Sequence, residues 1–179
     1  MLSEKLCKAF NAQINAELWS AYLYLSMSMD AAAKGHKGIA NWFKIQFQEE
    51  QAHAEIMMNH VLARGNEVKL APIDAVQTEW KDSLEAFKDT LVHEKKVTSL
   101  ITSLYELAIE DMDKAIELDT TNTFAYFNRA IMYYDQQKYQ AAMDDFNRVL
   151  RDEPGNALTL YNRGLISAQL GAYDEALSD

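Results

Sequence analysis

The chain has 179 residues, of which 49% are apolar, and only two prolines and six glycines, a composition typical of a well-packed, mostly helical protein. Its formal net charge of −10 excludes nucleic acid and anionic membranes as expected partners, because both would repel it. Cys7 is the single cysteine, so no intramolecular disulfide framework exists. With no signal-peptide pattern and no apolar run long enough to span a bilayer, a cytoplasmic protein is expected.

Three long helices are predicted in the first part of the chain. Apolar side chains recur at helical spacing over residues 3–33, and this run stops at Gly35. A second amphipathic run covers residues 39–64, with Gly65 as its predicted C-cap. A third helix is predicted to start within residues 74–80. The fold class expected from these runs is all-α.

The linker between the second and third helices, residues 66–78, is about as long as the second helix when extended. A helix over residues 39–64 is about 39 Å long, and the extended linker reaches roughly 43 Å. The linker can therefore run the full height of a helical bundle, which makes the second and third helices parallel, as in bundles with one long crossover. A disordered linker is the alternative, but four apolar residues offer anchors: Val68, Leu70, Ile73 and Val76.

The predicted core-facing stripe of each helix includes a carboxylate. The stripes are Leu6, Phe10, Gln13, Glu17, Ser20 and Tyr24; Phe43, Phe47, Glu50, Ala54 and Met57; and Leu84, Phe87, Leu91, Glu94, Thr98, Ile101 and Tyr105. A lone buried carboxylate costs several kcal/mol, so three of them at similar heights of one bundle indicate a shared cation. His53 lies three residues after Glu50 and hence on the same helix face, and an imidazole beside carboxylates suits iron.

Each of these features has a simpler interpretation when taken alone. A single Glu-x-x-His pair more often belongs to a solvated helix face, and a lone Glu in an apolar stripe is often an edge residue whose carboxylate reaches solvent. Di-iron bundles use two such pairs and two further glutamates, whereas this chain has the one pair Glu50 and His53. The combination therefore predicts a metal site whose second position is weakened.

Up to about residue 110 the chain resembles the bacterial non-haem ferritins. The resemblance rests on NAELWSAYLYLSM (residues 15–27), FQEEQAHA (residues 47–54) and HEKKVT (residues 93–98). It implies a protein that oxidises Fe(II) with oxygen or peroxide and stores ferric mineral inside a cage of identical subunits. The glutamate and the cage contacts that a ferritin fourth helix would add have no counterpart here, so full mineral storage is not expected.

The same resemblance implies a set of site residues. The implied metal ligands are Glu17, Glu50, His53, Glu94 and Glu49. The first three would hold one iron ion, the fourth would help to bind a second ion that Glu50 bridges, and the last belongs to an accessory third site. Tyr24 matches a tyrosine near the centre of the site and is the implied catalytic residue.

From about residue 104 the chain carries a 34-residue repeat. The repeated positions are Tyr105, Tyr139 and Tyr173, and Ala108, Ala142 and Ala176. Asn122 and Asn156, which share this spacing, are predicted N-caps of two further helices. The pattern resembles the tetratricopeptide repeat, whose small residues let paired helices pack closely.

In tetratricopeptide proteins, Asn128 and Asn162 would face the concave groove and contact a peptide or protein partner. The alternative is that the repeated Asn-Arg pair solvates the helix and braces the turn. So short a groove can bury little area, which favours this alternative.

The expected architecture is a ferritin-like bundle of three long helices over residues 1–110, running into tetratricopeptide repeats over residues 104–179. The two parts share one helix, and no linker rich in Gly, Pro or Ser separates them. A seamless splice of this kind suggests a chimera of two truncated pieces.

Two functions are expected to compete. The first is an iron-binding bundle with residual ferroxidase activity, whose Fe(II) oxidation depends on replacement of the missing fourth-helix ligands. The second is a non-catalytic scaffold or interaction protein in which the metal site is an inert remnant. Because three helices leave an apolar groove open, either function is expected in a homodimer or a larger homo-oligomer.

Overall fold

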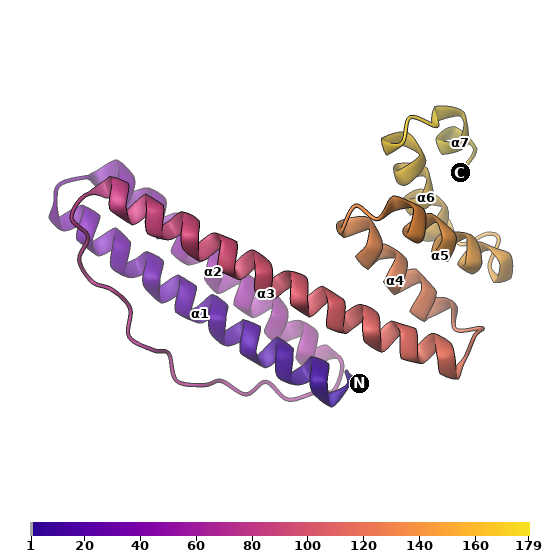
Figure 1. Ribbon diagram of the computed structural model, residues 1–179, viewed down its shortest axis with the longest axis horizontal. Coiled ribbons are helices and arrows are strands. Elements are labelled where there is room, and N and C mark those ends of the chain that lie inside the picture. The colour runs from indigo at the N-terminus through magenta and orange to yellow at the C-terminus, as the bar shows by residue number, and fades with distance from the viewer. Residues whose placement is uncertain (1) are drawn as a thin grey trace. The chain divides into compact units, whose positions relative to one another are not determined.

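The computed structural model describes residues 2–179, and all its regular elements in this range are helices. Seven helices follow one another along the described chain, as Figure 1 shows. Two compact units divide the chain after Leu104, so helix α3 contributes to both. The all-α prediction is confirmed for the described residues, in which three long helices precede four shorter ones.

The first unit starts with an antiparallel helix pair, α1 (Glu4–Ala33) and α2 (Lys37–Ala63). The side chain of Ser3 caps α1 by accepting a hydrogen bond from the backbone N–H of Leu6 at 3.1 Å. Gly35 ends the helix with φ 81°, a left-handed conformation that favours glycine. The turn is therefore short enough to place the two apolar stripes against each other.

The linker from α2 to α3 runs along α1 from end to end. Near the start of α1, the backbone N–H of Leu2 donates to Asn66 Oδ1 at 2.8 Å. Further along, Ser26 Oγ donates to the carbonyl of Gln77 at 2.7 Å, and Lys34 at the end of α1 bonds to the carbonyl of Trp80. Helices α2 and α3 therefore start at the same end of the bundle and are parallel, which confirms the predicted crossover (Figure 1).

Helix α3 (Ser83–Leu118) starts later than the predicted range of residues 74–80. Asp82 accepts a hydrogen bond from the N–H of Glu85 at 2.9 Å and so acts as the helix N-cap. Trp80 is buried before the helix begins, with its indole N–H donating to Asp89 at 2.9 Å. The apolar pattern before residue 83 thus belongs to the end of the crossover.

Two of the four predicted anchors of the crossover are wrong. Leu70 and Ile73 are 62% and 45% exposed, whereas Val68 and Val76 are half-buried. Val76 packs on the core cluster of the bundle, which contains Leu23, Tyr24, Met27, Phe43, Trp80 and Ala86. The crossover is therefore held mainly by its second half and by the hydrogen bonds to α1.

The predicted core-facing stripe of α3 is also wrong in its first half. Leu84 and Leu91 are 62% and 57% exposed, and Phe87 is held only at one side by the rings of Trp42 and Phe43. The face that packs on the bundle carries Ala86, Thr90, His93 and Val97. The reason is the missing neighbour: among the described residues of this unit, no further helix covers the stripe that a four-helix bundle would bury.

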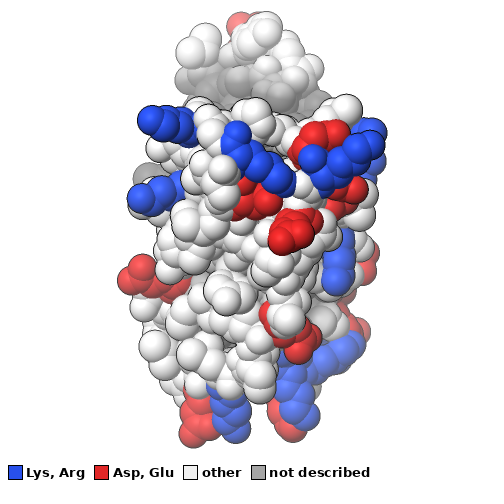
Figure 2. Space-filling model, turned by 90° about the vertical axis from the view of Figure 1, so that its left-hand side faces the viewer, with Lys and Arg blue, Asp and Glu red and all other residues white. Residues whose placement is uncertain are grey.

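The molecular face seen in Figure 2 carries acidic and basic side chains side by side, with wide uncharged areas between them. No extended area of one charge is visible on this face. Among the described residues, no helix is both long and apolar enough to cross a membrane.

The second unit continues from the end of α3 into α4 (Thr123–Asp135), α5 (Tyr139–Asp152), α6 (Ala157–Gln169) and α7 (Tyr173–Ser178). The predicted caps are present: Asn122 accepts from the N–H of Ala125, and Asn156 accepts from the N–H of Thr159, each at 3.0 Å. The core is built from Ala130, Ala142, Phe146 and Ile166. Small residues thus allow the close helix pairing that the repeat predicts.

Two arginines lie in equivalent positions of the second unit. Arg129 binds Asp113, sixteen residues before it, at 2.6 Å, and Asp145, sixteen residues after it, at 2.7 Å. Arg163 repeats the spacing with Asn147 at 2.8 Å and with Asp179. These contacts tie each helix to the helices on either side of it within the unit.

Candidate metal centre

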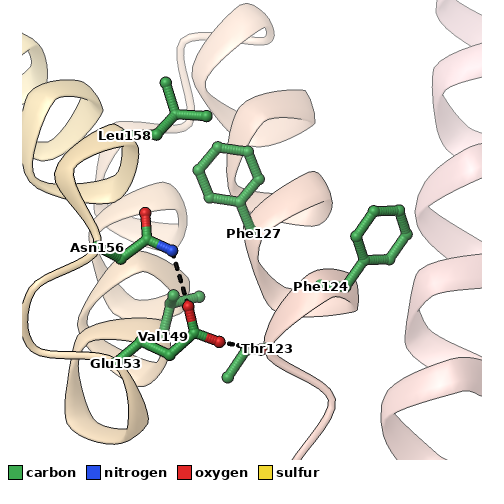
Figure 3. Close-up of a pocket in the computed structure, with 7 residues that line it drawn as sticks. All are labelled: Thr123, Phe124, Phe127, Val149, Glu153, Asn156 and Leu158. Carbon is green, nitrogen blue, oxygen red and sulfur yellow. Dashed lines mark hydrogen bonds between the residues drawn. The ribbon is translucent and has the colours of Figure 1, made fainter.

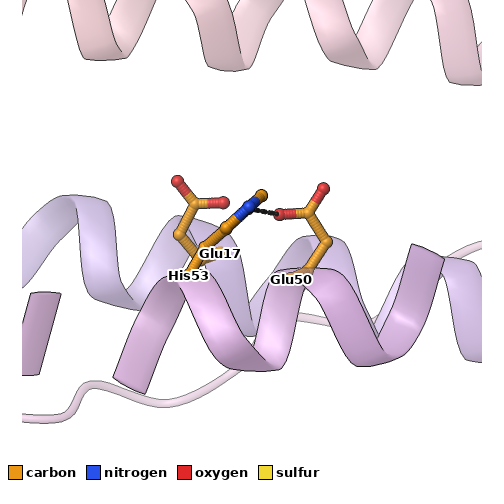
Figure 4. A group of neighbouring side chains, drawn as sticks. All are labelled: Glu17, Glu50 and His53. Carbon is orange, nitrogen blue, oxygen red and sulfur yellow. Dashed lines mark hydrogen bonds and ion pairs between the residues drawn. The ribbon is translucent and has the colours of Figure 1, made fainter. Parts of the chain in front are cut away.

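Three side chains of the bundle converge on one point. Glu17 extends from α1, and Glu50 and His53 extend from adjacent turns of α2 (Figure 4). One ligand atom from each side chain lies within 4.8 Å of the other two. The i, i+3 spacing on α2 places both of its donors on the face that meets α1. A single cation could therefore contact all three donors after small side-chain adjustments.

Glu17 is the most deeply buried member of the group. Its side chain is 1% exposed, and its Oε1 accepts a hydrogen bond from Gln13 Nε2 at 2.7 Å. Its other oxygen, Oε2, is buried and has no hydrogen-bond partner. An unpaired carboxylate oxygen in a closed interior is costly, and a bound cation would remove that cost. The donor set therefore fits a metal ion.

Glu50, on α2, is also buried, with 6% of its surface exposed. Burial and, after it, the neighbouring carboxyl of Glu17 together raise the pKa of Glu50 to about 7, against the opposing effect of His53. The carboxyl thus holds a proton in the metal-free protein at mildly acidic pH. A cation must displace this proton, so metal binding should strengthen as the pH rises towards 7.

The contribution of Glu50 to the stability of the metal-free protein should fall as the pH rises from 4.5 to about 7. The folded pKa of Glu50 lies above its ordinary value of 4.5, so the folded state binds more protons than the unfolded state in this window. The stabilisation that comes from protonated Glu50 is complete below pH 4.5. It is lost as the pH rises past the folded pKa of about 7. Glu50→Gln stays neutral, so its melting temperature relative to wild type should rise between pH 5 and 8. A difference that is constant with pH would contradict this prediction.

His53 forms the open side of the group. Its side chain is 56% exposed, and its Nδ1 lies 3.1 Å from Glu50 Oε2. The buried carboxylates and the exposed imidazole together make a site that is closed towards the core and open towards solvent on the His53 side. Ions can therefore reach it without unfolding of the bundle.

The structure does not bring Glu94 into the group of three. Glu94 is half-buried on α3, and its Oε1 accepts a hydrogen bond from the hydroxyl of Tyr24. Burial, followed by the bond to Glu94, raises the pKa of Tyr24, so the phenol remains protonated and acts as a donor. The ring of Tyr24 is fully buried and stacks on Phe43, with centroids 6.2 Å apart.

The remaining predicted site residues lie outside the group. Glu49 is exposed, and its carboxylate accepts a hydrogen bond from Gln46 at 2.5 Å. In the second unit, the side-chain amides of Asn128 and Asn162 donate to the carbonyls of Phe124 and Leu158, each at 2.7 Å.

Three polar neighbours of the site were not predicted as site residues. His93 is buried on α3, with Nε2 2.7 Å from Ser20 Oγ, and its ring lies 5.3 Å from that of Trp19. Burial lowers the pKa of His93. Gln13 holds Glu17, as described above. The signal for Gln13 and Ser20 was present in the sequence, because both interrupt the apolar stripe of α1 one turn from Glu17.

Comparison with known proteins agrees with this geometry. Residues 7–118 match the model of the ferritin-like domain, up to the last residue of α3. The chain belongs to the ferritin-like family. Residues 123–156 match a tetratricopeptide repeat, so this ferritin-like chain also carries a repeat of that kind.

The ferritin-like chain is 44% identical over 117 residues to a bacterial non-haem ferritin of Bacteroides fragilis, covering 65% of this chain and 74% of that protein. A bacterial non-haem ferritin of Staphylococcus aureus is 34% identical over 115 residues, covering 64% of this chain and 69% of that protein. Among solved structures, an open-pore ferritin from Archaeoglobus fulgidus superposes with a TM-score of 0.63 at 33% identity, over 94% of this chain and 97% of that chain.

Proposed function

We propose that this protein binds Fe(II) through Glu17, Glu50 and His53. The observation that carries the proposal is the buried, unpartnered Oε2 of Glu17 beside donor atoms of Glu50 and His53 within 4.8 Å. Carboxylate oxygen and imidazole nitrogen together form a donor set that suits iron. The relatives named bacterial non-haem ferritins support the choice of iron over other divalent ions.

We extend the proposal to residual ferroxidase chemistry. Two Fe(II) ions together supply the two electrons that reduce dioxygen to hydrogen peroxide, with two protons taken up. Glu50 would lie between the two ions, and Glu94 would contribute to the second, weaker position through the oxygen that does not accept from Tyr24. Tyr24 would act by holding the carboxylate of Glu94 and by donating its hydroxyl hydrogen bond beside the ions. Glu49 would serve an accessory site at the surface.

Anaerobic loading with Fe(II), followed by addition of oxygen, tests the proposal. The measured quantities are the ratio of iron to protein and the rate at which ferric absorbance appears. One ion per chain is expected to bind at Glu17, Glu50 and His53, with a weaker second ion and slow oxidation. Failure to bind any Fe(II) would overturn the iron-binding function, and binding without oxidation would overturn only the ferroxidase extension.

We also propose that the protein assembles as a homodimer or a larger homo-oligomer. Support comes from large apolar side chains exposed on the bundle helices: Ile56 at 66%, Leu84 at 62% and Leu91 at 57%. Sedimentation velocity tests this proposal directly, because a monomer at micromolar concentration would contradict it.

The cytoplasmic location of the protein remains a prediction from the sequence.

The second candidate function is a non-catalytic interaction module, and one observation favours it. Helices α4, α5 and α6 border an open pocket of about 220 Å³ that Phe127, Val149 and Asn156 help to line (Figure 3). Phe124 and Leu158 at its edge are 69% and 58% exposed. The pocket is large enough to accept an apolar side chain of a peptide partner. One N–H of each Asn128 and Asn162 amide donates within its own helix, so these residues would contribute to such binding through the second N–H and the carbonyl oxygen.

The chimera hypothesis is kept as a proposal about origin. The ferritin-like match ends at residue 118 and the tetratricopeptide match begins at residue 123, so only residues 119–122 lie between the two. A natural gene that encodes the same junction would overturn it.

A further inference from the structure

The candidate metal ligand on α1 is held by a neutral donor one helical turn away. Gln13 is 4% exposed, and its Nε2 lies 2.7 Å from Glu17 Oε1. The two residues are four apart, so the contact lies within a single turn and depends only on the integrity of α1. The second carboxylate oxygen is left buried and without a partner.

This arrangement distinguishes the two oxygens of Glu17. A glutamate side chain has three rotatable bonds, and a free carboxylate can present either oxygen or both to a cation. The amide of Gln13 donates to Oε1, so Oε2 is the oxygen left without a partner for a cation at this group of donors. Hydrogen-bond partners of metal ligands commonly fix ligand orientation in this way.

The chemical nature of the donor also matters. A lysine or arginine in place of Gln13 would hold the carboxylate but would cancel its negative charge, which attracts the cation. An amide orients the carboxylate and leaves the charge intact. The pair of side chains thus combines orientation with full electrostatic attraction.

We propose that Gln13 is a positioning residue for metal binding, which acts through Glu17 by restricting it to one-oxygen coordination. This inference rests on the proposed iron-binding function. Gln13 does not touch the ion itself; its effect is transmitted entirely by the orientation of the Glu17 carboxylate.

A double-mutant cycle with Co(II) tests the inference without any catalytic readout. Gln13→Leu removes the donor at similar volume and is expected to weaken Co(II) binding about 10–100-fold. In a Glu17→Ala background the same substitution should have no further effect, because the carboxylate that Gln13 orients is gone. Gln51→Leu, at an exposed glutamine on α2, is the matched control and should bind Co(II) as wild type does.

The visible spectrum of bound Co(II) gives a second readout. Two-oxygen coordination by a released Glu17 raises the coordination number, so Gln13→Leu should lower the intensity of the d–d bands per bound ion. Gln13→Met, which keeps the length of the side chain, replaces Gln13→Leu if the latter does not fold.

The outcomes separate this inference from the function on which it rests. Equal weakening by Gln13→Leu with and without Glu17 would show a merely structural role and overturn the inference, as would unchanged Co(II) affinity. A wild-type protein that binds neither Co(II) nor Fe(II) would overturn the proposed function and the inference with it. Wild-type binding that is lost in Glu17→Ala, while Gln13→Leu binds normally, would overturn the inference alone.

Discussion

Replacing Glu50 by alanine is expected to abolish the thermal stabilisation that Fe(II) or Co(II) gives to this protein. Glu50 is 6% exposed, and one of its carboxylate oxygens lies within 4.8 Å of donor atoms of both Glu17 and His53. An ion present at 100 times its dissociation constant stabilises a folded protein by about 2.7 kcal/mol. The variant should lose nearly all of this increment, measured as the difference in melting temperature between metal-loaded and metal-free samples.

Glu55→Ala is the matched control for this experiment, because Glu55 is an exposed carboxylate on the same helix. It should keep the full metal-dependent increment. The increment, and not the absolute melting temperature, is the decisive quantity, since removal of a buried carboxyl changes metal-free stability as well. An unchanged increment in Glu50→Ala would show that ions bind elsewhere and would leave the interaction module as the better explanation.

Phe146→Ala is expected to destabilise the second unit by about 3–5 kcal/mol. Phe146 is fully buried, packs against Ala130, Ala142 and Ile166, and its ring lies 5.7 Å from that of Phe127. A unit as small as residues 105–179 has a total stability of only about 4–11 kcal/mol. The substitution should therefore lower helical content and make α4–α7 sensitive to protease at temperatures at which wild type resists.

Phe124→Ala provides the comparison, because Phe124 is 69% exposed on α4 and should tolerate the same change with little loss. Co(II) binding by Phe146→Ala gives an additional test, since the candidate ligands belong to the first unit. Retained Co(II) binding together with an unfolded repeat would show that the units are stable independently. Equal sensitivity of the two variants to protease would contradict the core assignment.

Sequence periodicity correctly located Glu50 on α2 and four buried residues on α1. Gln13, Glu17, Ser20 and Tyr24 all lie on the stripe predicted for α1, and all are buried. The prediction was possible because the partner that covers each stripe is encoded in the same unit and is packed antiparallel. The repeat was also predicted correctly from the sequence, since Asn122 and Asn156 both act as helix N-caps.

The prediction was wrong where burial depends on a neighbour that the unit does not contain. The Leu84 and Leu91 stripe of α3 has the periodicity of a core face, yet it is exposed because no further helix of its unit covers it. Sequence spacing also gives no information on how far one helix is displaced along another. The hydrogen bond from Tyr24 to Glu94 depends on that displacement, so it could be found only from the three-dimensional structure. The assignment of individual site residues to iron stays a prediction.

The arginine contacts of the second unit also bear on how the number of repeats can change. Arg129 and Arg163 are 34 residues apart, and each binds partners sixteen residues before and after it. Deletion of residues 130–163 would bring Asp179 to the place that Asp145 now occupies relative to Arg129, and a tandem duplication of that segment would supply Asp145 again. Gain or loss of one 34-residue segment thus leaves each of these half-buried arginines with a carboxylate partner sixteen residues after it. The length of this part is therefore open to change by unequal recombination, without an intermediate that buries an uncompensated charge.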